Sequence, residues 1–180
     1  MKTAVRILAG RWKGRPLDVP RDARPTSSRA REALFDILRD AIPESRILDL
    51  FAGSGAVGLE ALSRGAAEAV FVEQDSRALQ ANLARLGART AEAEILQGDA
   101  RDAVIGLARR GARFDLVFAD PPYGLEKTVA SRSVSTILAS GGKLVVQTDS
   151  DSEPPKVPRL APAGRRAYGR NVFWFFEKEE

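Results

Sequence analysis

The sequence contains no cysteine, no histidine and a single methionine. Without cysteine the chain can form no disulfide, no thiolate metal site and no thiol nucleophile. Without histidine it lacks the side chain that most often serves as a general base at neutral pH and most often binds zinc. We therefore expect no metal site in this protein.

Long apolar segments are also missing. No run of residues approaches the length of a membrane span, and the N-terminus lacks the apolar core of a signal peptide. We therefore expect a cytoplasmic protein with no membrane partner. A length of 180 residues suits one domain with a small extension, and it is enough to bury a sizeable core. We expect it to act as a monomer.

Positive charge is concentrated at the N-terminus. Residues 1–31 contain nine Lys or Arg and two Asp, whereas residues 32–180 contain 19 basic and 22 acidic residues. A basic arm on a mildly acidic body indicates a polyanionic partner such as nucleic acid. The alternative is a basic tail that is merely solvated.

The most informative stretch is a glycine-rich turn after an apolar run. Residues 46–50 predict a strand, and the apolar spacing after the turn predicts a helix over 57–64. Gly53, Gly55 and Gly58 satisfy the G-x-G-x-x-G pattern of nucleotide-binding loops. Such a turn predicts a ligand site, because backbone and helix N–H groups can approach the ligand closely. Both a nicotinamide or flavin nucleotide and S-adenosylmethionine (SAM) fit this pattern.

Strands and helices alternate along the rest of the chain. The predicted strands are 46–50, 69–73, 94–97, 114–119, 143–147, 165–168 and 172–176. The predicted helices are 29–38, 57–64, 76–86, a stretch around 104–108, and 126–138. The segment 149–164 is polar with four prolines and is interpreted as a mobile or functional loop. This alternation predicts an α/β fold, a mostly parallel seven-stranded sheet with helices on both faces.

Four carboxylates follow or end the first four strands. They are Asp49, Glu73, Asp99 and Asp120. Ligands of such sheets bind outside the carboxyl ends of the strands, so these acids should lie close together. Glu73 has about the spacing from the glycine loop expected of an acid that accepts from ribose hydroxyls. Asp99 is a candidate acceptor for an adenine amino group, or else a turn residue after glycine.

The fourth predicted strand runs into Asp120-Pro121-Pro122-Tyr123. Prolines hold their carbonyls in fixed directions and lack N–H groups, so Asp120 and a proline carbonyl form a rigid pair of acceptors. Such a pair suits an exocyclic amine, which has two N–H donors, and Tyr123 supplies a ring on which a base can stack. Asp120 is expected to be ionised, as an ordinary aspartate of pKa about 3.9 would be. The alternative is a stiff turn without a chemical role.

The N-terminal arm predicts a β-hairpin whose turn is basic. Residues 5–9 and 17–19 are the predicted strands, and Thr26 or Ser27 is the predicted cap of the helix that follows. An aromatic ring among cations suits nucleic acid, although Trp12 can equally anchor the hairpin to the body. Arg29 is placed unfavourably for the helix dipole, which indicates a phosphate ligand or a solvated side chain. The candidate RNA-binding residues are Arg11, Trp12, Lys13, Arg15, Arg24 and Arg29.

These motifs together carry a family resemblance. The glycine loop, Glu73 and the Asp-Pro-Pro-Tyr motif are similar to those of SAM-dependent amino-methyltransferases. The stretches 6–10, 24–35, 48–66 and 168–172 more narrowly resemble the RsmD-type 16S rRNA (guanine-N2) methyltransferases. The resemblance spans nearly the whole chain. One departure is Gln147, where that family often has glutamate.

The resemblance implies a Rossmann-like SAM-dependent methyltransferase domain over 26–180, preceded by a basic hairpin extension over 1–25. It implies methyl transfer from SAM to the 2-amino group of a guanine in small-subunit rRNA, naked or within an assembled particle. The implied cofactor-binding residues are Asp49, Phe51, Gly53, Ser54, Gly55, Glu73, Gln74, Asp99 and Ala100. The implied catalytic residues are Asp120, Pro121, Pro122 and Tyr123.

Three other functions remain open at this point. An adenine amino-methyltransferase acting on DNA or RNA would use the same Asp-Pro-Pro-Tyr motif. A nicotinamide-dependent oxidoreductase could use the glycine loop, although Asp49 would then lie near a pyrophosphate. A non-catalytic RNA-binding protein would explain the basic arm but not the four carboxylates.

Overall fold

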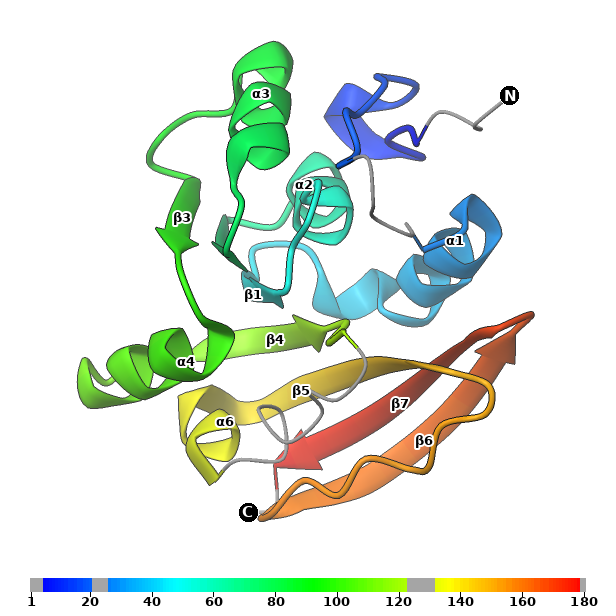
Figure 1. Ribbon diagram of the computed structural model, residues 1–180, viewed down its shortest axis with the longest axis vertical. Coiled ribbons are helices and arrows are strands. Elements are labelled where there is room, and N and C mark those ends of the chain that lie inside the picture. The colour runs from blue at the N-terminus through cyan, green and yellow to red at the C-terminus, as the bar shows by residue number, and fades with distance from the viewer. Residues whose placement is uncertain (1–4, 21–25, 123–131, 179–180) are drawn as a thin grey trace.

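The computed structural model describes residues 5–20, 26–122 and 132–178 (Figure 1). One seven-stranded sheet has the order β3-β2-β1-β4-β5-β7-β6. The strands β1 to β5 pair in parallel, and β7 is antiparallel to both of its neighbours. The strands are β1 (Arg46–Leu50), β2 (Glu68–Glu73), β3 (Ala93–Gln97), β4 (Phe114–Ala119), β5 (Leu138–Asp149), β6 (Leu160–Tyr168) and β7 (Asn171–Lys178). The predicted mostly parallel sheet is confirmed.

Helices cover both faces of the sheet. They are η1 (Gly10–Trp12), α1 (Ser28–Ile37), η2 (Arg39–Ala41), α2 (Ala56–Ser63), α3 (Arg77–Leu86), α4 (Ala100–Arg109) and α6 (Arg132–Ile137). One core cluster joins one sheet face to the arm, α1, α2 and α3. The second joins the other face to α4 and α6. Among the described helices, none is long and apolar enough to cross a membrane.

The C-terminal part departs from the sequence-based prediction. The segment predicted as a loop over 149–164 already contains the start of β6, which begins at Leu160. Leu160 and the nearby Val157 are buried in the second core cluster, which draws this segment onto the sheet. Pro162 is compatible with strand geometry there because β6 is an edge strand. The predicted helix 126–138 begins outside the described residues, and its described part is α6.

The N-terminal arm, defined here as residues 5–20, has a hairpin-like path. Ile7 N–H donates to the Arg15 carbonyl (3.0 Å) and Leu17 N–H to the Val5 carbonyl (2.8 Å). Only one bridge, between Arg6 and Pro16, has sheet geometry, and η1 forms the tip. The predicted pair of strands is therefore reduced to a ladder of backbone bonds around a 3₁₀ turn.

The arm lies against α2 and shares the core of the body (Figure 1). Gly10 has φ +78°, and a Cβ there would lie 1.8 Å from the Ser63 carbonyl oxygen, so only glycine allows this close approach. The Ser63 hydroxyl donates to the Ala9 carbonyl and accepts from Trp12 N–H. The buried carboxylate of Glu60 accepts from Leu8 N–H and Ala9 N–H at 2.7 and 3.0 Å. These contacts fix the arm along the helix.

Candidate active site

A pocket of about 690 Å³ lies at the carboxyl ends of the parallel strands. This volume is in the range of small-molecule sites, and the position beside β1 and β4 is the topological switch point of the sheet. Its lining includes the expected Asp49, Phe51, Gly53, Ser54, Glu73, Gln74, Ala100, Asp120, Pro121 and Pro122. It also includes Thr26, Ser27, Gln147, Thr148, Asp149, Arg170 and Asn171, which sequence reasoning did not place in the site.

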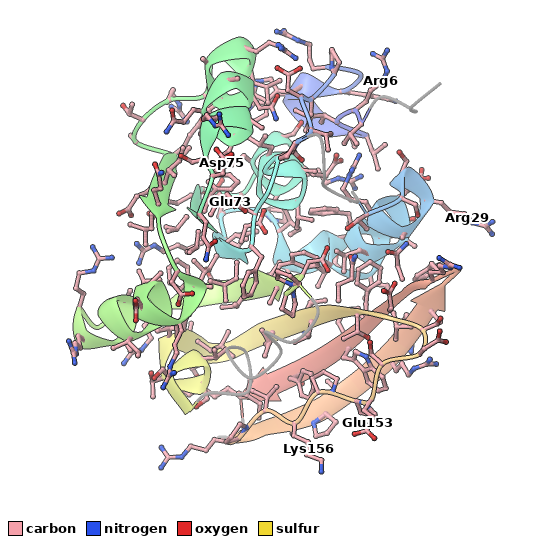
Figure 2. All side chains as sticks on the ribbon, viewed as in Figure 1. Arg6, Arg29, Glu73, Asp75, Glu153 and Lys156 are labelled. Carbon is pink, nitrogen blue, oxygen red and sulfur yellow. The ribbon has the colours of Figure 1, made fainter. Side chains whose placement is uncertain are left out.

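The glycine loop wraps the floor of the pocket. Phe51 and Gly53 both have positive φ, 61° and 56°, which turns the chain back on itself after β1. The Glu73 carboxylate accepts from Gly53 N–H (2.7 Å) and from Asp75 N–H (3.1 Å) (Figure 2). Both oxygens are thereby oriented at the end of β2, and each keeps a lone pair for a further donor.

Gly55 has a packing role that the sequence did not indicate. It caps α2 with φ +77°, and a Cβ built on it would meet Leu79 at 2.4 Å and Leu59 at 3.2 Å. The missing side chain therefore makes room for core packing between α2 and α3, and Gly55 does not line the pocket. This geometry gives Gly55 a role in shaping the loop, and its expected contact with the cofactor stays a prediction.

Asp49 lies at the end of β1 with 2% of its surface exposed. Its Oδ2 accepts from Gly58 N–H at 2.9 Å, which ties the carboxylate to the first turn of α2. Burial raises the pKa of Asp49 to about 7; the bond from Gly58 opposes the rise, and the charges of Asp120 and Glu73 add to it.

Asp120 directly follows β4 and faces the same cavity. Its Oδ2 accepts a hydrogen bond of 3.1 Å from the Gln147 side-chain amide. Burial raises the pKa of Asp120 to about 7, and the charge of Asp149 adds to the rise. The prediction of a fully ionised Asp120 is therefore corrected, because the fold places this carboxylate in a poorly solvated position near another acid.

Gln147 joins three segments at the pocket. Besides Asp120, its Nε2 donates to Asn171 Oδ1 (3.2 Å), and its Oε1 accepts from the Thr26 hydroxyl (2.9 Å). Asn171 Nδ2 in turn contacts the Ser27 hydroxyl oxygen at 3.5 Å, and this oxygen caps α1. The predicted cap at Ser27 is confirmed. Nothing in the local sequence could have paired residues 24 to 121 positions apart in this way.

Asp99 caps a helix beside the pocket, and the role expected of it toward an adenine amino group stays a prediction. Its Oδ1 accepts from Arg101 N–H (2.8 Å) and Asp102 N–H (3.3 Å), so the side chain caps α4. Gly98 and Ala100, on either side of it, line the pocket, whereas Asp99 does not. The turn interpretation is thus the one that the geometry favours, because Asp is a strong N-cap residue.

Two expected site residues, Tyr123 and Arg24, lie outside the described residues. Pro121 is half-buried and Pro122 is exposed, both at the pocket. Their position next to Asp120 is consistent with the predicted acceptor pair. The function expected of Tyr123 remains a proposal.

The structure corrects one member of the candidate RNA-binding set. Trp12 is only 8% exposed and packs in the core, so it anchors the arm and cannot stack on a base. Arg11 lies over the Trp12 ring at 4.0 Å and pairs with the buried Glu92 at 2.7 Å. Arg15 donates to the Arg85 carbonyl (2.7 Å), whereas Lys13 and Arg29 are exposed.

The pocket is negatively charged as a whole. Four carboxylates line it, Asp49, Glu73, Asp120 and Asp149, against one cation, Arg170. Such a site favours a cationic ligand and groups that donate hydrogen bonds, and it disfavours a pyrophosphate. No group of three or more side chains within the described segments has the arrangement of a metal site.

Comparisons with known proteins show the family of this chain. The family model described as Conserved hypothetical protein 95 matches residues 5–177. The ribosomal RNA small subunit methyltransferase D of Escherichia coli (strain K12) is 39% identical, with 91% of this chain and 87% of the relative covered. The protein of the same name from Haemophilus influenzae is 36% identical, with 83% and 81% covered.

Solved structures give the same result. The Escherichia coli protein yhhF has a TM-score of 0.83 and 36% identity, and 98% of this chain and 99% of that chain are covered. The sheet order and this likeness establish the Rossmann-like fold of SAM-dependent methyltransferases. The chain therefore belongs to the family described as Conserved hypothetical protein 95, the family of the ribosomal RNA small subunit methyltransferase D proteins.

Proposed function

We propose that this protein transfers a methyl group from S-adenosylmethionine to the exocyclic 2-amino group of a guanine in bacterial 16S rRNA. The observation that carries the proposal is that Asp120, Pro121 and Pro122 line the same pocket as Glu73 and the glycine loop. Acceptors for an amine and groups suited to an adenosine moiety thus share one cavity. The names of the relatives support rRNA as the substrate.

The residues present fit SAM as cofactor. Glu73 has two oriented oxygens that would accept from the ribose hydroxyls, and the main chain of 51–54 would lie against the ligand. Glu73 and Asp49 both line the pocket, and carboxylates there would favour the positive charge of the cofactor. When bound, SAM supplies an activated methyl group on a sulfonium centre.

The chemistry that we assign to the chain is positioning of a poor nucleophile. The lone pair of a guanine 2-amino group is delocalised into the ring. Asp120 Oδ1 and the Pro121 carbonyl would accept the two N–H groups, which favours a rehybridised amine whose lone pair faces the methyl carbon. SAM would supply the methyl group, and the Asp120 carboxylate would accept the proton that the amine gives up. No histidine is required.

The substrate has to present its base outside the stack. A guanine inside an RNA helix cannot reach this cavity, so it must be extruded into it. We propose Tyr123 as the ring that stacks on it, and Arg11, Lys13, Arg15, Arg24 and Arg29 as contacts to the RNA. We further propose that the protein acts as a monomer in the cytoplasm, on naked rRNA or on an assembled particle.

The test is transfer of a labelled methyl group. Protein is incubated with labelled SAM and either 16S rRNA or small ribosomal subunits, and the labelled nucleoside is identified after digestion. We expect N2-methylguanosine from wild type and little product from Asp120→Ala. Asp102→Ala, at an exposed acid on α4, is the control and should behave as wild type. Labelled N6-methyladenosine would favour an adenine enzyme, and binding of NADH without SAM binding would contradict the proposal.

A further inference from the structure

Most cations of the N-terminal arm are already engaged within the protein. Arg6 donates to the Gly14 carbonyl at 3.0 Å, and Arg11 pairs with Glu92. Arg15 donates to the Arg85 carbonyl. Arg31, just beyond the arm, is fully buried beside Glu60. Of these three arm cations, Arg11 is paired with an opposite charge, whereas the bonds of Arg6 and Arg15 to backbone carbonyls orient their side chains without neutralising them.

A second basic surface lies where α1 meets the turn between β6 and β7. Asn171 contacts Ser27 here, and Gln147 bonds to both Asn171 and Thr26, so the junction is held by side-chain hydrogen bonds. Figure 1 shows this turn at the edge of the sheet on the side of α1. The same junction forms one wall of the pocket, because Thr26, Ser27, Arg170 and Asn171 line it.

Three exposed arginines surround this junction, and we call them the junction arginines: Arg29, Arg166 and Arg170. Arg29 is two residues after Ser27 and extends away from the body (Figure 2). Arg166 pairs in register with Phe173, so the two side chains lie on the same face of the sheet. Phe173 packs in the same core cluster as α1, and Arg166 is therefore on the face that α1 covers. Within the described part of the chain, none of the three forms an ion pair.

A simpler explanation covers only part of this surface. Charged side chains on an edge strand such as β6 discourage pairing with other chains, which would account for Arg165 and Arg166. It does not account for Arg170, which lines the pocket, or for Arg29, which lies on a helix. Acids are also present, since Glu32 follows Arg29 by one turn and Asp149 pairs in register with Asn171. The three junction arginines outnumber these two acids.

We infer that the junction arginines hold the phosphates of the RNA strand whose target base enters the pocket. This inference rests on the proposed function and adds to it the surface by which the substrate is received. The electrostatics separate the two parts of a nucleotide: the rim at Arg170 is cationic and suits a phosphate, whereas the floor at Asp49, Glu73 and Asp120 suits hydrogen-bond donors. A strand crossing α1 and the β6–β7 turn would thus present one base to Asp120.

The experiment compares the salt dependence of RNA binding in two triple variants. The junction variant carries Arg29→Gln, Arg166→Gln and Arg170→Gln. The control carries the same change at three exposed arginines near the amino end of β4, Arg109, Arg110 and Arg113. For single strands, each phosphate contact contributes roughly 0.7 to the slope of the logarithm of the RNA-binding constant against the logarithm of the salt concentration. We therefore expect this slope to be flatter by about 2 in the junction variant. The control should keep the wild-type slope.

Further measurements separate the possible results. Thermal unfolding should be unchanged in both variants, because all six side chains are exposed. An unchanged slope in the junction variant, or an equal change in the control, would overturn the inference. A third variant at Arg11, Lys13 and Arg15 tests the arm; a flattened slope in that variant alone would place the RNA on the arm instead. Binding needs no methyl transfer, so failure of the proposed function would appear separately, as the wrong methylated nucleoside in the parallel assay.

Discussion

Replacing Glu60 by glutamine perturbs the attachment of the N-terminal arm to α2. The Glu60 side chain is fully buried, and it accepts from Leu8 N–H, Ala9 N–H and Arg64 Nε. Its Oε2 also lies 3.8 Å from Nε of the fully buried Arg31. Burial lowers the pKa of Arg31, and the charge of Glu60 opposes this effect. Without Glu60, a buried guanidinium would have no counter-charge.

The expected loss can be worked from this geometry. Removing one partner of a buried ion pair typically costs about 3–5 kcal/mol, because the other charge remains desolvated. For a chain of this size each kcal/mol corresponds to about 2–4 °C in Tm, so Tm should fall by roughly 6–20 °C. Thermal and urea unfolding followed by circular dichroism measure both quantities. The control is Glu68→Gln, whose pair with Arg46 is about one third exposed and should be worth about 0–1 kcal/mol.

A double variant keeps the prediction testable if Glu60→Gln alone does not fold. Arg31→Met combined with Glu60→Gln removes the unpaired charge and keeps an amide oxygen for the arm N–H groups. Glutamine has one oxygen, so one of the two arm N–H groups loses its acceptor in both variants, and the double variant should be more stable than Glu60→Gln alone because it lacks the unpaired charge. If Glu60→Gln unfolds within about 1 kcal/mol of wild type, or if the double variant is less stable than the single one, the ion pair does not fix the arm as described.

The site gives three further predictions. Asp120→Ala should lower kcat by about 10²–10³ while calorimetry finds SAM affinity within a few-fold of wild type; near-normal turnover would refute the role of Asp120. Glu73→Ala should weaken SAM binding without loss of fold, and unchanged affinity by calorimetry would exclude the ribose role. The pKa of Asp49 and that of Asp120 are both raised from 3.8 to about 7, so their contribution to stability is present below pH 3.8 and is lost as pH rises through about 7. SAM affinity and turnover should rise with pH over the same interval, because the carboxylates ionise. Asp49→Asn should flatten the dependence of the free energy of unfolding on pH. A SAM affinity that does not change with pH would contradict the roles given to these carboxylates.

Local sequence was sufficient for the frame of the site. The bounds of β1 and β4 agree with the prediction, because each is an apolar run ended by an acid or a glycine-rich turn. The convergence of Asp49, Glu73 and Asp120 on one pocket also followed from sequence, since parallel strands bring their carboxyl ends to one edge of the sheet. The cap of α1 at Ser27 could also be predicted from the sequence, because a capping side chain bonds to a backbone N–H only three residues away.

What each residue does at that edge was decided by contacts across the fold. Trp12 is buried because α2 and the arm pack together, and Arg11 forms an ion pair with Glu92, 81 positions away. Asp120 has a raised pKa because β5 and its neighbours bury it near Asp149, which no local pattern encodes. Gly55 satisfies a nucleotide-loop motif, yet its missing side chain is required by Leu79 on another helix. Sequence determines periodicity and the order of strands, whereas desolvation, long-range pairing and close packing exist only once the chain has folded.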